Sequence, residues 1–145
     1  MKIALGADHK GYPLKEKIKS YLMQRGEEVV DFGTDSDESV DYPDFGLKVA
    51  HSVADGDVDY GINICWTGNG MNMAANKVKG VRSGLCLSEE MAELTRSHND
   101  ANVLSLASKY VSETEALKIV ELFLSTKFEG GRHIQRLEKI LAEEK

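Results

Sequence analysis

The chain of 145 residues contains little cysteine, no long apolar run and no excess of positive charge. Its two cysteines, Cys65 and Cys86, form no C-x-x-C pair, and no histidine follows either at a zinc-ligand spacing, so we expect reduced thiols and no metal site. No stretch approaches the roughly 20 apolar residues that cross a bilayer, and the apolar run at the start is too short for a signal peptide. We therefore expect a cytoplasmic protein without a membrane partner.

The balance of charge also excludes a class of partner. Eighteen basic and 24 acidic residues give a net charge of −6, which would repel nucleic acid unless the basic residues were gathered in one patch. Hydrophobic residues make up 41% of the chain and charged residues 29%, which is ordinary for a globular protein and excludes disorder. We predict a single domain over residues 1–145 that does not bind nucleic acid.

Apolar, β-rich runs alternate with amphipathic stretches along the chain. This alternation predicts right-handed βαβ crossovers and hence a doubly wound, Rossmann-like three-layer α/β sandwich, in which helices cover both faces of a five-stranded parallel sheet. The last helix extends past this minimal architecture, so we expect it to pack on a dimer partner. The expected strands are Ile3–Gly6, Glu28–Phe32, Tyr60–Cys65, Val81–Cys86 and Val103–Leu106; the expected helices are Tyr12–Gln24, Phe45–Ala54, Met71–Lys77, Glu89–Arg96, Thr114–Ser125 and Gly131–Glu144.

The loop Cys65–Gly70 leads from a predicted strand into a helix, where doubly wound sheets bind their ligands. Its two glycines permit close backbone approach, so several amide N–H groups can face an anion. The pattern does not extend to G-x-G-x-x-G, because Met73 occupies the last position, and the chain has no Walker loop. A dinucleotide site is therefore not expected, and a merely tight strand-to-helix turn is the alternative interpretation.

The two cysteines differ in their settings. Cys65 ends a strand at the mouth of this loop, where a helix N-terminus and clustered amides would lower the pKa of the thiol and make it available as a base or nucleophile. A small buried hydrophobe is the alternative for this residue. Cys86 lacks that setting, so we expect it in the core.

Two histidines lie in predicted loops beside hydrogen-bonding partners, in Asp8-His9 and His98-Asn99. An imidazole in such a place suits ring opening and proton transfer. His51, inside an amphipathic helix, is interpreted as a surface or packing residue. For His133 the sequence leaves both interpretations open.

Arg132 and Arg136 are four residues apart and so share one face of a predicted helix. Together they could grip a phosphate with forked donors. Such a pair more commonly lies on a helix face exposed to solvent. The two neighbouring positive charges repel each other, however, and a bound anion would remove this repulsion.

Six short segments follow one another along nearly the whole chain: Asp8-His9, Asp41–Asp44, Cys65–Gly70, Ala74–Lys77, Arg96–Asn102 and Glu129–His133. Together they resemble the ribose-5-phosphate isomerase B family, which includes the galactose-6-phosphate isomerase subunits. The resemblance implies a sugar-phosphate aldose–ketose isomerase that acts on a phosphorylated pentose without a metal or other cofactor.

The resemblance also implies roles for particular residues. Cys65 would be the base that moves a proton across an enediolate, Thr67 would assist it, and His98 would protonate the ring oxygen during furanose opening. The family is dimeric with shared sites, so we expect a homodimer in which His98 and Asn99 serve the partner subunit, and whether dimers pair into tetramers stays open. The implied substrate-binding residues are Asp8 and Tyr42 at the sugar, Asn99 at the sugar or enediolate, the amides of Trp66, Gly68, Asn69 and Gly70 at the anion, and His9, Lys109, Arg132 and Arg136 at the phosphate.

Two positions depart from the family pattern. Trp66 stands where the family usually has glycine, and its indole would narrow the sugar site, stack on substrate or point outward. Lys109 stands where an arginine often binds phosphate, which keeps the charge but loses the forked donors. We therefore expect modestly weaker phosphate binding.

Three other functions remain open at this point. The first is the same reaction on galactose 6-phosphate or allose 6-phosphate, which would need a longer pocket rather than other catalytic residues. Galactose-6-phosphate isomerases use two different subunits, whereas this chain carries the full catalytic set, which favours the ribose enzyme. A sugar-phosphate sensor without activity is expected to lack the base, whereas Cys65 is present. A flavodoxin-like domain is expected to have a flavin loop or an acidic cluster after the first strand, where only Asp8 occurs.

Overall fold

The computed structural model describes residues 1–144, so only Lys145 of the predicted domain lies outside it. Five strands form one parallel sheet in the order β2-β1-β3-β5-β4. The strands are β1 (Lys2–Ala7), β2 (Glu28–Asp31), β3 (Tyr60–Cys65), β4 (Ser83–Leu85) and β5 (Val103–Ala107). The helices are α1 (Tyr12–Gln24), α2 (Tyr42–Ala54), α3 (Asn69–Asn76), α4 (Glu89–Ser97), α5 (Glu113–Ser125) and α6 (Arg132–Leu141).

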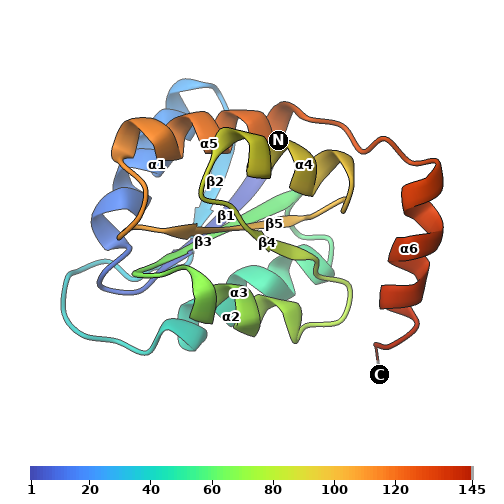
Figure 1. Cartoon of the computed structure of the whole chain (residues 1–145). Coiled ribbons are helices and arrows are strands. Elements are labelled where there is room, and N and C mark those ends of the chain that lie inside the picture. Colours follow the sequence, from blue (N-terminus) through green and yellow to red (C-terminus); the bar gives the residue numbers. More distant parts are fainter. Residues whose placement is uncertain (145) are drawn as a thin grey trace.

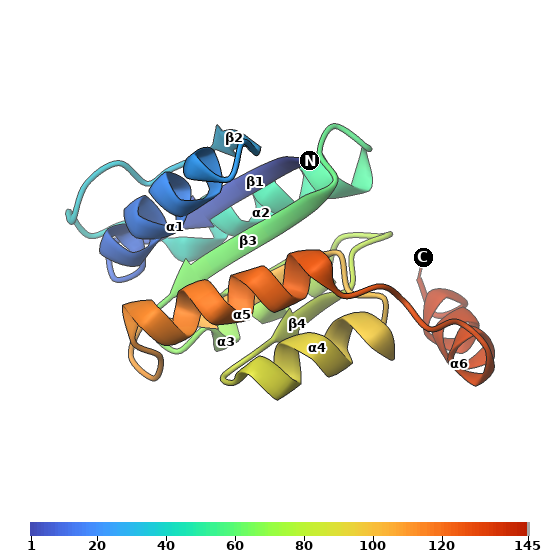
Figure 2. The ribbon, with the colours of Figure 1, turned by 90° about the horizontal axis from the view of Figure 1, so that it is seen from above.

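The predicted doubly wound sandwich is confirmed. Helices α1, α4 and α5 cover one face of the sheet, and α2 and α3 cover the other (Figures 1 and 2). Each face buries its own apolar cluster, one centred on residues such as Leu5, Ile64 and Phe123 and the other on valines of α2 and its neighbours. The strand order reverses between β1 and β3, so the loops after these two strands meet at the position where such sheets bind ligands.

Element boundaries differ from the prediction at a few ends. Helix α2 begins at Tyr42 rather than Phe45. Pro43 is tolerated in its first turn because N–H groups there have no carbonyl partner within the helix, so the missing N–H of proline costs no hydrogen bond. Helix α3 begins at Asn69, two residues earlier than predicted. Strand β4 covers only Ser83–Leu85 at the sheet edge, and the side chain of Val81 packs into the core under α2 instead.

Cys86 lies in the core, as predicted. Its side chain is fully buried, and this burial raises the pKa of the thiol to about 12. The residue is therefore an inert apolar filler. In the described part of the chain, no helix is long and apolar enough to cross a membrane.

Helix α6 stands apart from the three layers (Figure 1). It buries only His133 and Leu137, and leaves apolar side chains such as Ile134, Ile140 and Leu141 exposed. A hollow of 730 Å³ lies between this helix and the segment from α3 to β4. An amphipathic helix with uncovered apolar residues is typical of an element that packs on another chain.

Candidate functional site

The loop after β3 begins directly at Cys65. The backbone N–H groups of Thr67, Gly68 and Met71 lie near enough to its sulfur to favour the thiolate and lower the pKa of the thiol. Gly68 has φ +74°, and a Cβ atom there would lie 2.5 Å from Leu85 Cδ1 and 3.0 Å from the carbonyl carbon of Leu106. Only glycine fits this position, so the predicted cluster of amides depends on it.

Burial raises the pKa of the Cys65 thiol. The amides of Met71 and Gly68 act in the opposite direction, and the nearby carboxylate of Asp8 adds to the rise. The prediction of a lowered pKa is therefore wrong, because the sulfur loses its hydration in a residue that is only 5% exposed. At neutral pH this side chain is mostly the thiol, and only its ionised fraction can act as a base.

The loop after β1 places Asp8 near Cys65, and His9 follows it in the same loop. The buried Asp8 carboxylate accepts hydrogen bonds from the N–H groups of Lys10 at 3.0 Å and Gly11 at 2.9 Å. His9 Nδ1 accepts a hydrogen bond from the N–H of Val40 at 3.2 Å. A neutral His9 therefore carries its proton on Nε2, which is free to donate to an anion.

Tyr42 lies directly on the glycine-rich loop. A Cβ atom on Gly70 would come within 2.5 Å of Tyr42 Cζ and 2.7 Å of its hydroxyl oxygen. Nearby, the Thr67 hydroxyl oxygen accepts the N–H of Asn69 at 3.4 Å. The first turn of α2 and the first turn of α3 thus meet over the loop that follows Cys65.

Trp66 is half-exposed at the rim of this site. Its indole lies beside two ammonium groups, those of Lys10 at 5.1 Å and Lys109 at 5.8 Å from a ring centroid, within the range of cation–π attraction. The N–H of Lys109 also donates to the Trp66 carbonyl at 2.9 Å. Within residues 1–144 neither lysine pairs with a carboxylate, so both charges remain available to an anion.

The remaining predicted residues lie at the amino-terminal ends of the strands, opposite the end that carries Cys65. Helix α4 runs antiparallel to the strands, so His98 and Asn99, which follow it, lie near the residue where β5 begins. Cys65 pairs with Ala107 at the other end of β5, roughly 13 Å of strand away. Helix α6, which carries the exposed Arg132 and Arg136, lies on the side of the sheet where α4 ends (Figure 1). One chain therefore holds the predicted site as two separated halves.

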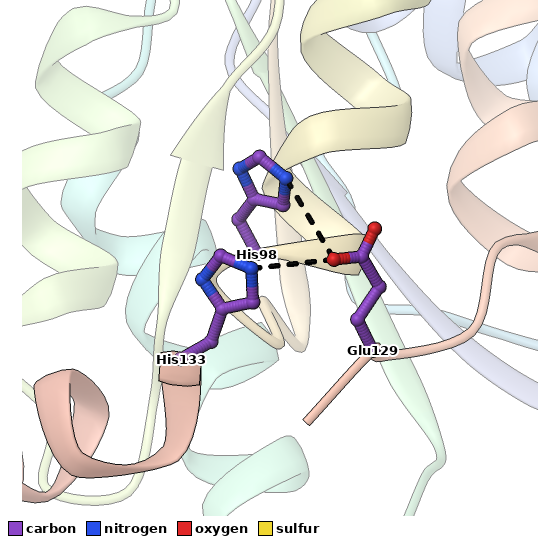
Figure 3. A group of neighbouring side chains, drawn as sticks. All are labelled: His98, Glu129 and His133. Atoms are coloured by element: carbon purple, nitrogen blue, oxygen red, sulfur yellow. Dashed lines mark hydrogen bonds and ion pairs between the residues drawn. The ribbon is translucent and has the colours of Figure 1, made fainter. Parts of the chain in front are cut away.

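The half at His98 contains two residues that were not predicted as functional. Glu129 Oε2 lies 3.3 Å from His133 Nε2 and 3.9 Å from His98 Nε2 (Figure 3). The two imidazole rings stack with centroids 4.3 Å apart and planes inclined by 18°. The signal in the sequence was the segment Glu129–His133, one of the six that carried the resemblance.

These three side chains are also the group best placed to hold a metal ion among the described residues, with ligand atoms within 4.8 Å of one another. A tetrahedral ion, however, needs ring nitrogens whose lone pairs converge on one point. The two stacked rings are nearly parallel, so their nitrogens point in similar directions rather than toward a common centre. The arrangement fits a carboxylate that is hydrogen-bonded to His133 and close to His98 better than a metal chelate.

Comparisons with known proteins agree over nearly the full length. A family model described as Ribose/Galactose Isomerase matches residues 3–140. Ribose-5-phosphate isomerase B of Escherichia coli is 49% identical over 141 residues, which cover 97% of this chain and 95% of that protein. The structure of Clostridium thermocellum ribose-5-phosphate isomerase B is similar with a TM-score of 0.97 and 53% identity, covering 98% of this chain and 96% of the other. That of the Mycoplasma genitalium isomerase with bound ribulose-5-phosphate has a TM-score of 0.93 and 48% identity, over 97% and 94% of the two chains.

Proposed function

The chain belongs to the ribose/galactose isomerase family and is an aldose–ketose isomerase, and on that premise we propose that it interconverts ribose 5-phosphate and ribulose 5-phosphate with Cys65 as the base. The observation that carries the proposal is the buried sulfur of Cys65 at the carboxyl end of β3, near the backbone amides of the glycine-rich loop and the carboxylate of Asp8. The bound ketose in the Mycoplasma genitalium relative supports the choice of substrate. The whole of residues 1–145 would act as one sugar-phosphate isomerase domain.

The chemistry follows from this geometry. The Cys65 thiolate takes the proton from C2 of the open-chain aldose and returns it to C1, while the proton of the C2 hydroxyl passes to the C1 oxygen, so that the carbonyl moves from C1 to C2. Negative charge develops on the oxygens of the enediolate between these two steps. Donors fixed in advance at such an oxygen are worth roughly 3 kcal/mol each, and the amides of the loop from Trp66 to Gly70 are placed to supply them. The hydroxyl of Thr67 would assist the proton transfer.

The phosphate group would be held by positive and donor groups on both sides of the loop. His9 Nε2 and the Lys109 ammonium lie on the half of the site that contains Cys65. Arg132 and Arg136 lie on exposed turns of α6 and would approach from a partner subunit. Fixing the far end of the substrate in this way keeps its reacting carbons within reach of the base.

The separation of the two halves supports a homodimer with shared sites. Because His98 lies near the amino-terminal ends of the strands and Cys65 at the carboxyl end of β3, His98 cannot serve the base of its own chain. A second copy packed against α6 would cover its exposed apolar residues and bring His98 and Asn99 to the partner's Cys65. A C2 dimer of this kind forms two such sites at once.

The pH dependence of isomerisation tests the role of Cys65. Because burial raises the pKa of the thiol, the thiolate fraction grows as pH rises. For exchange of the C1 hydrogen of ribulose 5-phosphate, an open-chain substrate that needs no ring opening, we expect kcat/KM to increase about tenfold per pH unit on the acid side of that pKa. The increase should continue at pH 9.0, the ordinary value for a thiol. Initial rates of this exchange in deuterium oxide from pH 6 to 10 measure it. A plateau below pH 8 would contradict Cys65 as the base, and no conversion at any pH would overturn the proposed function.

A further inference from the structure

We infer that Glu129 and His133 are positioning residues that hold the imidazole of His98 in the orientation needed to open the sugar ring. The inference rests on the proposed function, in which His98 donates a proton to the ring oxygen of the furanose. It adds two residues that lie outside the proposed catalytic and binding sets. Neither would touch the substrate, and both would act through His98.

The contacts around His98 leave its ring one well-supported orientation. One face stacks on the ring of His133 at 4.3 Å, and His133 is itself buried to 5% exposure. Glu129 lies at the Nε2 edge, at 3.3 Å from the Nε2 atom of His133 and 3.9 Å from that of His98. The buried ring of His133 thus supports one face of the half-exposed His98 ring, and the carboxylate of Glu129 lies at its Nε2 edge.

The backbone keeps these groups in register. The N–H of Glu129 donates to the carbonyl of Ser97, the residue before His98, at 3.0 Å. Arg96 Nε donates to the carbonyl of Thr126 at 3.3 Å, which ties the same connecting segment to α4 a few residues earlier. Gly130 and Gly131 then have φ +71° and +56°, and this left-handed turn brings His133 back beneath His98.

The orientation decides which nitrogen faces the substrate. Glu129 stands at Nε2, and Nδ1 of His98 lies on the side of the ring away from the carboxylate (Figure 3). A carboxylate at one nitrogen of a histidine keeps the proton there and leaves the other nitrogen to react. In ring opening, the His98 imidazolium would give its Nδ1 proton to the ring oxygen as the bond from C1 to that oxygen breaks, and the C1 hydroxyl would lose its proton to water, giving the aldehyde and a free C4 hydroxyl.

Hydrogen exchange on the ketose separates ring opening from proton transfer. Ribulose 5-phosphate is already open, so exchange of its C1 hydrogen with deuterium oxide needs Cys65 but not His98. Conversion of the cyclic ribose 5-phosphate needs both. For Glu129→Gln and His133→Ala, we expect conversion of ribose 5-phosphate to fall at least about tenfold while deuterium exchange at C1 of ribulose 5-phosphate stays within about twofold of wild type.

Matched variants complete the experiment. Gln135→Ala, on an exposed position of the same helix, should change neither rate, and Cys65→Ala should lose both. Glu129 is exposed, so Glu129→Gln keeps the inference testable if the His133 variant does not fold. A parallel loss of both rates in Glu129→Gln, or no loss of either, would overturn the positioning role. If wild-type protein shows neither exchange nor conversion, the proposed function fails and this inference fails with it.

Discussion

Cys65→Ala is expected to lower kcat for the interconversion of ribose 5-phosphate and ribulose 5-phosphate by about a thousandfold. The substitution removes the proposed base and leaves the amides of Thr67, Gly68 and Met71 in place, so substrate binding should change far less than turnover. General base catalysis of proton transfer is worth about 10²- to 10⁴-fold in rate, which sets this magnitude. Steady-state rates together with the KM for ribose 5-phosphate measure the effect.

Cys86→Ala is the matched control, because it removes the second buried thiol, which belongs to the core cluster and not to the loop after β3. The thiol of Cys86 is fully buried with a pKa of about 12, so its loss should lower stability by about 1 kcal/mol and leave kcat near that of wild type. More than a tenth of wild-type turnover in Cys65→Ala, in protein that unfolds at the wild-type temperature, would show that another group is the base.

Mixing two inactive variants should restore activity if the sites are shared. A dimer of Cys65→Ala with His98→Asn carries both lesions in one site and leaves the other site intact. Random pairing of equal amounts makes half of the dimers mixed, so we expect about a quarter of wild-type activity. The two proteins would be unfolded together in denaturant, refolded by dilution and assayed on ribose 5-phosphate.

Two lesions on the same half of the site provide the control. Cys65→Ala refolded with Thr67→Val should recover little, because every site then has one damaged loop or the other. Absence of recovery in the first mixture, with mixed dimers shown by mass spectrometry of differently tagged chains, would mean that His98 does not serve the partner's Cys65.

Most of the fold follows from the periodicity of the sequence. Largely apolar runs such as Tyr60–Cys65 are typical of strands buried on both faces, and amphipathic stretches such as Tyr12–Gln24 are typical of the helices that cover them. Both elements were predicted at their observed bounds. Pattern alone did not predict Lys15, which is fully buried on the apolar face of α1 and paired with Asp31 at 2.7 Å. Its partner is 16 residues away, on strand β2. The periodicity of apolar residues predicts which face of a helix is buried, but not ion pairs between different elements.

The half of the site at Cys65 was predictable because its residues follow strand ends. The carboxyl ends of parallel strands lie at the same end of the sheet, so Asp8 and the loop after Cys65, which follow adjacent strands, had to meet there. The direction of the Cys65 pKa shift was not predictable, since burial outweighs the amides and burial depends on the folded chain. The Glu129 and His133 pair was missed for a related reason, because its stacking on His98 joins α6 to the end of α4.

The most direct test of the proposed function is the specificity of the wild-type enzyme, measured in EDTA because the proposed proton transfer requires no metal. We expect kcat/KM for ribose 5-phosphate to exceed that for allose 6-phosphate and galactose 6-phosphate by at least about tenfold, because a site built for a pentose phosphate would fix the distance between the base and the phosphate ligands. A preference for either hexose phosphate would contradict the pentose assignment. Binding of all three sugars without conversion would contradict the isomerase itself.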